Sequence, residues 1–176
     1  TAKLRAGDNR RFAGEDLAAQ QIAIHKGKRL GAAELGLIAS LGIAQVMVYR
    51  RLRVAYFSTG DEIRSLGESL TTGSIYDSNR YTIFSMLKKM NFDVIDLGVV
   101  PDQPNALETT LQQACLHADA IITSGGVSVG AADYTKEVMS KLGEVAFWTI
   151  EMRPGRPMAF GNINHQGKSA YLFGLP

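Results

Sequence analysis

A glycine-rich stretch behind a short apolar run constrains the fold of this chain more than any other feature. The apolar run is Ala120–Ile122, and the stretch after it reads Thr123-Ser-Gly-Gly-Val-Ser-Val-Gly130. A strand that breaks into glycines and then a helix lets the backbone approach a ligand. Successive N–H groups and the helix N-terminus then favour an anion. The stretch therefore predicts a phosphate-binding turn between a strand and a helix.

A second junction of the same kind lies earlier in the chain, at Val54-Ala-Tyr-Phe-Ser-Thr-Gly-Asp-Glu62. Here too an apolar run closes in glycine followed by an acid. Ligands of open α/β sheets bind outside the carboxyl ends of parallel strands. The two junctions together predict one site at the carboxyl edge of a parallel sheet.

The order of elements predicts a three-layer α/β/α domain with a mostly parallel sheet over residues 51–176. Strands are expected at 54–58, 92–98, 119–123, 145–150, 158–160 and 170–173, some of the later ones antiparallel, and helices at 77–90, 104–117 and 133–142. Residues 1–50 are expected to form a small appendage from a neighbouring domain. It holds one short helix at 32–41 with Gly42 as its C-cap, followed by a strand or linker at 44–49.

Composition narrows the class of protein. The chain has 176 residues, of which 45% are hydrophobic and 20% charged, as in globular domains. The single cysteine, Cys115, excludes an intramolecular disulfide and favours a cytosolic home. No apolar run approaches the ~20 residues that span a bilayer. The chain stops directly after a strand-like segment, so we expect a fragment of a longer protein.

The net charge of +2 hides an uneven distribution. Residues 1–53 hold ten Lys and Arg against four acids, and the remainder is acidic. The basic residues are scattered and few aromatic residues lie between them. This pattern favours a solvated face, or one that meets an anionic ligand, over nucleic-acid binding.

Acidic residues follow three consecutive predicted strands. Asp61 and Glu62 are candidates to hold a hydroxyl, a metal or a water, or are solvated turn acids. Asp102 either caps the next helix or takes part in function. Asp133 either caps the helix that carries Lys136 or holds a cation against a bound phosphate. Their common placement predicts that they converge on one crevice.

Two further segments carry candidates. Asp77-Ser-Asn79 opens a helix, where Asp or Ser caps by default. Arg153-Pro-Gly-Arg156 is a stiff turn whose guanidinium groups are either exposed or suited to phosphate capture. Other site classes lack support, because no P-loop or G-x-G-x-x-G pattern is present and the three histidines do not cluster at metal spacing.

The chain resembles the molybdopterin molybdenumtransferase (MoeA) family in the order and spacing of its motifs. These are S-T-G-D-E, I-Y-D-S-N-R, L-G-V-V-P-D-Q-P, I-I-T-S-G-G-V-S-V-G-A-A-D-Y-T-K, R-P-G-R-P-M-A-F-G and G-L-P. Phe12-Ala-Gly-Glu-Asp16 and the helix around 33–42 extend the resemblance into the appendage. The string S-G-G-V-S-V-G with a downstream Asp separates it from the related MogA-like adenylyltransferases and from CinA-like proteins.

The resemblance implies a MogA-like, molybdopterin-binding fold and the last step of molybdenum cofactor synthesis. Such enzymes insert molybdate into adenylylated molybdopterin and release AMP, assisted by Mg²⁺, in the cytoplasm. A MogA-type adenylyltransferase would act as pathway partner. The full-length protein would be a homodimer, with residues 1–50 belonging to a linker or dimerisation domain.

The resemblance also implies site residues. The catalytic acids would be Asp16, Glu62, Asp102 and Asp133; Glu62 and Asp133 would hold Mg²⁺, and Asp16 would face the glycine loop of the other chain. The implied cofactor-binding set is Thr59, Gly60, Asp77, Ser78, Asn79, Ser124, Gly125, Gly126, Val127, Ser128, Gly130, Lys136, Arg153, Pro154, Gly155 and Arg156.

The sequence departs from the family at three positions. Thr149 stands where the family has a basic residue, which puts molybdate binding there in doubt. Arg153 and Arg156 stand where the family has lysines, and arginine also binds anions. The alternatives left open are an adenylyltransferase of the MogA type and a non-catalytic binding or scaffold module.

Overall fold

The structure is a computed structural model that describes residues 3, 5–127, 133–149, 151 and 157–176; the side chains of 133–136 and 147–149 lie outside this description. The chain divides into two compact units, residues 1–49 and 50–176. Each unit is described by itself.

The first unit contains the short helix α1, Ala32–Ser40. At its start the Gly31 N–H donates to the Glu34 carboxylate at 2.9 Å. At its end Leu41 is the C-cap, and Gly42 follows with a φ of +71°. The sequence predicted Gly42 as the C-cap. Gly42 instead follows the C-cap by one residue, in the left-handed backbone conformation that favours glycine at that position. Residues 44–49 form no strand and serve as the linker.

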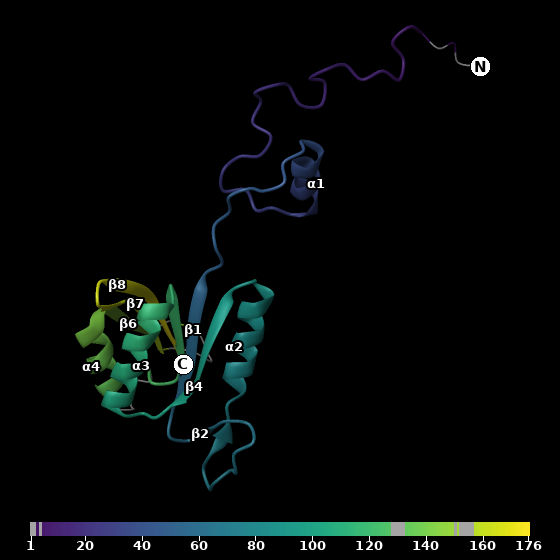
Figure 1. Ribbon diagram of the computed structural model, residues 1–176. Coiled ribbons are helices and arrows are strands. Elements are labelled where there is room, and N and C mark those ends of the chain that lie inside the picture. The colour runs from purple at the N-terminus through teal and green to yellow at the C-terminus, as the bar shows by residue number, and fades with distance from the viewer. Residues whose placement is uncertain (1–2, 4, 128–132, 150, 152–156) are drawn as a thin grey trace. The chain divides into compact units, whose positions relative to one another are not determined.

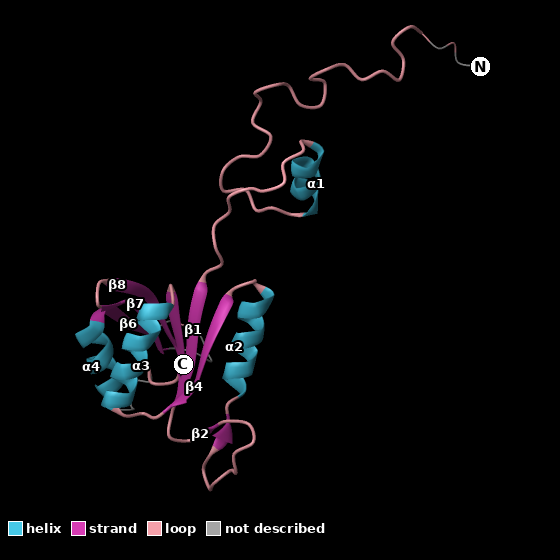
Figure 2. Cartoon of the chain, viewed as in Figure 1, coloured by secondary structure: helices cyan, strands magenta, loops and turns pink. Residues whose placement is uncertain are grey.

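The second unit is built on a six-stranded sheet with the order β4-β1-β5-β8-β7-β6. Its strands are β1 Arg53–Thr59, β4 Asp93–Val100, β5 Ala120–Ser124, β6 Gly143–Thr149, β7 Pro157–His165 and β8 Lys168–Leu175. The strands β4, β1, β5 and β8 pair in parallel, and β7 runs antiparallel to both of its neighbours. Figure 2 shows these strands in magenta between the helices. The predicted, mostly parallel sheet is confirmed.

Three helices cover the sheet: α2 Ser78–Lys89, α3 Pro104–His117 and α4 Asp133–Leu142. Along β1, Ala55 and Phe57 join the core beneath α3, whereas Tyr56 and Ser58 point to the opposite face, where α2 packs on β1 and β4. Figure 1 shows α3 and α4 together on one side of the strands and α2 on the other. The domain is therefore the expected three-layer α/β/α fold.

One element was not expected from the sequence. Between β1 and α2 the chain makes an excursion, residues 60–77, that carries the two-residue strands β2 Ile63–Arg64 and β3 Ile75–Tyr76. These strands pair in parallel with each other in a sheet of their own. The excursion extends from the carboxyl end of β1 (Figure 1).

The core depends on the apolar face of α3. Leu107, Leu111, Ala114 and Cys115 are all buried, at the spacing of one helix face. The Cys115 thiol donates to the Ile163 carbonyl at 3.2 Å, and burial raises its pKa. Cys115 is thus a packing residue with little thiolate character.

Within the second unit, an ion pair joins the residues before β1 to the amino end of the sheet. The Arg50 guanidinium donates to both carboxylate oxygens of Asp119 at 2.6 Å, and the Arg53 N–H donates to one of them at 2.8 Å. The bond from Arg50 is the main reason that the pKa of the Asp119 carboxyl falls from 3.8 to about 2. The pair fastens residues 50–53 to the start of β5.

Substitution of Leu111 tests whether the apolar face of α3 forms part of the core. Leu111 is fully buried, so we expect Leu111→Ala to lower the free energy of unfolding by about 2–5 kcal/mol. Gln113→Ala, on the exposed face of the same helix, serves as the control and should change it by less than about 0.5 kcal/mol. Urea unfolding of both variants measures the difference, and equal effects would contradict the assignment.

The ion pair between Asp119 and Arg50 predicts how the free energy of unfolding depends on pH. Because the folded pKa of Asp119 is lowered, the pair stabilises the fold fully above the unfolded pKa of the carboxyl, and this stabilisation is lost as the pH falls through about 2. We expect Asp119→Asn to lower the free energy of unfolding at pH 7 by about 0.5–1 kcal/mol. The gap between variant and parent should close in acid, and a gap independent of pH would refute the ion pair.

Candidate functional site

The carboxyl ends of three neighbouring strands meet at one edge of the sheet. Thr59 at the end of β1 pairs with Val100 at the end of β4, and Ser58 pairs with Ser124 at the end of β5. The residues that follow these ends therefore lie at the same edge. This arrangement brings the two glycine junctions together, as the sequence predicted.

The glycine turn after β5 lies against the backbone of β1. A Cβ atom on Gly125 would lie 2.1 Å from the Thr59 carbonyl oxygen, and the φ of Gly125 is +87°. The Gly125 N–H donates to the carbonyl of Leu175, at the end of β8, at 3.0 Å. Both the conformation and the close approach require glycine here.

Backbone conformation also favours glycine at the end of β1. Gly60 has a φ of +149°, and a Cβ atom there would lie 2.8 Å from Oε2 of the exposed Glu62 side chain, which can move. The carboxylate of Glu62 therefore folds back against the Cα of Gly60. Asp61 and Glu62 are both exposed, so their carboxylates are open to a ligand or an ion at the sheet edge.

The N-terminus of α2 brings two polar side chains to this edge, of which Asp77 is buried. Asp77 is 3% exposed and is the N-cap of the helix, accepting from the Arg80 N–H at 3.0 Å. Asn79 donates to the Ser124 hydroxyl at 2.9 Å, which ties the helix to the end of β5. The predicted cap at Asp77 is confirmed, and Asn79 links two elements instead of only capping.

A buried hydroxyl pair underlies the same edge. The Tyr56 and Ser58 hydroxyls lie 2.8 Å apart on the face of β1 that α2 covers. Burial is the main reason that the pKa of Tyr56 is raised, and the charge of Asp77 adds to the effect. The phenol therefore stays protonated and acts as a structural hydrogen-bonding group.

Arg80 holds the start of α2 against β4. Its Nε donates to the two carboxylate oxygens of Asp96 at 2.9 and 3.1 Å, in a solvent-exposed contact whose side chains are 20% and 29% exposed. A register irregularity between β1 and β4 follows Asp96, and there Gly98, with a φ of +75°, faces the guanidinium. This contact positions Asp77 and Asn79 relative to the strand ends.

Asp102 corrects one expectation. The N-cap of α3 is Gln103, without a side-chain bond to the helix, so Asp102 is not the cap that the sequence suggested. Proline at Pro104 already fixes the first turn and supplies no N–H to cap. Within the described chain, one oxygen of Asp102 is buried without a hydrogen-bond partner.

The Asp102 oxygen is one of four buried polar atoms of this kind among the described residues. The others are Thr59 Oγ1, Asp77 Oδ2 and Thr123 Oγ1. Buried polar atoms are nearly always hydrogen-bonded, so a ligand or water is expected to supply partners here, and the two carboxylate oxygens need donors.

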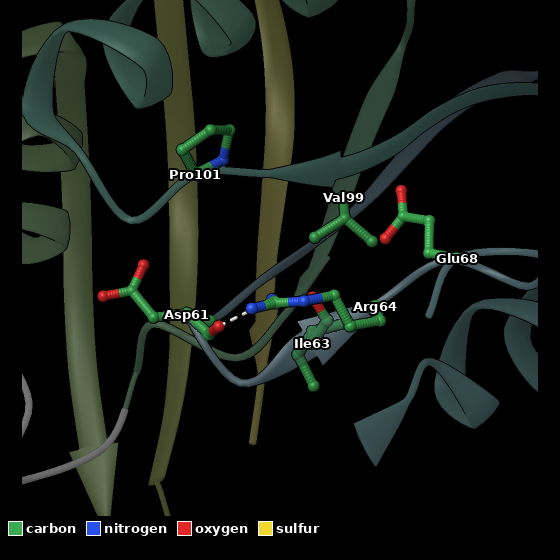
Figure 3. A pocket seen from close by; sticks show the side chains of 7 residues that line it. Asp61, Ile63, Arg64, Glu68, Val99 and Pro101 are labelled. Carbon is green, nitrogen blue, oxygen red and sulfur yellow. Dashed lines mark hydrogen bonds between the residues drawn. The ribbon is translucent and has the colours of Figure 1, made fainter. Parts of the chain in front are cut away.

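A pocket of about 520 Å³ opens beside the end of β1 (Figure 3). It is lined by Gly60, Asp61, Ile63, Arg64, Glu68, Val99 and Pro101. The sequence singled out only Gly60 and the Asp61-Glu62 pair from this region. Arg64 and Glu68 were missed because they lie in the excursion, which reads as an ordinary polar loop.

Several predicted residues lie outside the described structure. These are Ser128, Gly130, Arg153, Pro154, Gly155 and Arg156 entirely, and the side chains of Asp133, Lys136 and Thr149. Asp16 belongs to the first unit, where its exposed carboxylate pairs with Arg11. Ser78, Gly126 and Val127 lie within the helix start and the turn described above.

Among the described residues, no three His, Cys, Asp or Glu side chains gather into a metal-binding group. No helix there has the length and apolar character that crossing a membrane requires.

Comparison with known proteins shows the family to which this chain is similar. Residues 55–176 match the family described as "Probable molybdopterin binding domain", and residues 1–42 match the "MoeA N-terminal region (domain I and II)". The chain is 45% identical over 172 residues to a molybdopterin molybdenumtransferase of Haemophilus influenzae, covering 98% of this chain and 42% of that protein.

Solved structures give the same fold. A molybdopterin biosynthesis MoeA protein from Pyrococcus horikosii is similar with a TM-score of 0.75 and 35% identity, over 93% of this chain and 39% of that one. The biosynthesis enzyme MoaB of Thermus thermophilus shares the fold alone, with a TM-score of 0.52 and 20% identity over 71% of this chain and 80% of that one. The chain spans about two fifths of the length of the Haemophilus and Pyrococcus relatives.

Substitution of Gly125 tests the close approach of the turn after β5 to the Thr59 carbonyl. Gly167 is the matched control, because it also has a positive φ but has nothing within 4 Å of an added Cβ. We expect Gly167→Ala to lower the free energy of unfolding by about 1–2 kcal/mol through φ alone. Gly125→Ala should cost clearly more in the same thermal unfolding experiment. Equal losses would mean that Thr59 does not restrict this position.

Proposed function

The chain belongs to the family of probable molybdopterin-binding domains, and we propose that it is the part of a molybdopterin molybdenumtransferase that holds the pterin substrate. The observation that carries the proposal is the edge itself, inside the matched range. There the glycine turn lies on Thr59, and the buried carboxylate oxygens of Asp77 and Asp102 lack donors within the described chain. Such an edge is built for a ligand that carries both phosphate and donor groups.

The reaction is the insertion of molybdate into adenylylated molybdopterin. The two dithiolene sulfurs bind the molybdenum, and one molybdate oxygen leaves as water with the two thiol protons. A second water cleaves the phosphoanhydride bond, which releases AMP and leaves the phosphate on the pterin. The N–H of Gly125 is bonded to Leu175, so contact with the phosphates falls to the N–H groups that follow it and to the start of α4. Asp102 accepts a donor of the substrate at its buried oxygen.

Of the two residues assigned to Mg²⁺, the structure describes only the side chain of Glu62. Glu62 presents an exposed carboxylate at the edge, next to Gly60, and among the described side chains no ion pair involves it. Asp133 begins α4 directly after the glycine stretch. Glu62 and Asp133 would hold Mg²⁺, which prefers hard oxygen ligands and keeps several waters. When bound there, the ion would neutralise phosphate charge.

The assembly is part of the same proposal. The match of residues 1–42 to the MoeA N-terminal region supports a homodimer in which the first unit serves dimerisation. Asp16 then acts as a catalytic acid in the cleft of the other chain. A MogA-type adenylyltransferase supplies the substrate, and the enzyme works in the cytoplasm. The same match favours a molybdenumtransferase over an adenylyltransferase of the MogA type.

Calorimetric titration of the chain with molybdopterin, with and without Mg²⁺, tests the proposal. Mg²⁺ should strengthen binding, and Asp133→Asn should weaken the Mg²⁺-dependent binding by about ten-fold or more. Asp93→Asn is the control, because Asp93 is an exposed acid at the start of β4. Absence of binding by the parent chain, or equal loss in both variants, would reject the proposed site.

A further inference from the structure

We propose that the pocket bounded by Arg64 binds the pterin ring, with the Arg64 guanidinium donating to the oxygen and nitrogen acceptors on the edge of the ring. The proposal rests on the proposed function, which supplies molybdopterin as the ligand. We call this cavity the Arg64 pocket, lined by Gly60, Asp61, Ile63, Arg64, Glu68, Val99 and Pro101.

Arg64 is held across the pocket by the backbone. Its Nη1 donates to the carbonyl of Asp61 at 2.7 Å and to that of Ile63 at 2.8 Å. Figure 3 shows the guanidinium reaching toward the Asp61 carbonyl. The group is half-buried, and these two bonds engage one of its three nitrogens. A guanidinium carries five N–H donors, so the remaining ones are available to a ligand.

The acids of the pocket leave Arg64 unpaired. Among the described residues, no ion pair joins Arg64 to Asp61 or to Glu68. One oxygen of Glu68 accepts from the Ser65 N–H at 3.1 Å, which fixes the side chain. The Asp61 carboxylate points away from the guanidinium (Figure 3). The pocket therefore offers separate donors and acceptors.

The remaining lining is apolar. Ile63 and Val99 present aliphatic side chains, and Pro101 adds a ring from the end of β4 (Figure 3). The volume of about 520 Å³ lies in the range of pockets for small organic ligands. Flat apolar faces of a ligand would contact these side chains.

This lining selects among ligand classes. A phosphate alone is disfavoured by two carboxylates, and a bare cation is disfavoured by the guanidinium. A neutral bicyclic heterocycle with an oxo group, ring nitrogens and an amino group can accept from the guanidinium and donate to the carboxylates. Its faces can contact the apolar side chains. Pterin is such a heterocycle. Because the pocket includes Gly60, a ring bound here would extend its phosphate toward the glycine turn.

The experiment uses pterin fluorescence to measure the binding of free pterin to the 176-residue chain, and calorimetry to measure the binding of molybdopterin. Arg64→Ala should weaken both by about ten-fold or more, because it removes the donors of the pocket. Arg51→Ala is the matched control, since Arg51 is 60% exposed and precedes β1 at the opposite end of the sheet. It should bind like the parent.

A second variant distinguishes the loss of a pocket contact from a loss of folding. Glu68→Gln keeps the size of the side chain and removes its charge, and it should weaken pterin binding while the thermal unfolding midpoint stays near that of the parent. If the parent binds molybdopterin and both pocket variants bind it equally well, the assignment of the pocket is wrong. If the parent binds no molybdopterin, the proposed function itself fails.

Discussion

The contact between Gly125 and the carbonyl of Thr59 governs the arrangement of the site. It permits the turn after β5 to lie directly on the end of β1. The same turn is bonded to the end of β8 through Leu175, and Ser124 just before it accepts from Asn79 of α2. The strands β1, β5 and β8 and the helix α2 thus meet at Gly125. A larger residue there would move the turn away from the end of β1.

Much of the fold follows from patterns within single segments. The bounds of α3 and α4 agree with the prediction, because their apolar spacing and the proline at the start of α3 are local signals. β7 is much longer than expected, since its pairing with β6 and β8 sets its length. The strands β2 and β3 were missed, because two-residue strands depend on contacts across the excursion and leave no periodicity.

The candidate site divides in the same way. Glycine and cap positions such as Gly125 and Asp77 were predictable, because backbone conformation and helix starts leave signals in the sequence. For Asp102 the sequence left a cap and a functional role open, and the structure rules out only the cap. Arg80 and Arg64 were not predictable as site elements. Their roles depend on partners from other elements or on a pocket that exists only in the folded chain.

Hydrogen exchange of the chain with and without molybdopterin tests the central claim most directly. If the ligand binds at the carboxyl edge, protection should rise in the segments 58–64, 98–103 and 124–127 and remain unchanged at 117–119, at the amino end of β5. Protection confined to 117–119, or spread evenly over the sheet, would contradict a site built where the glycine turn meets β1.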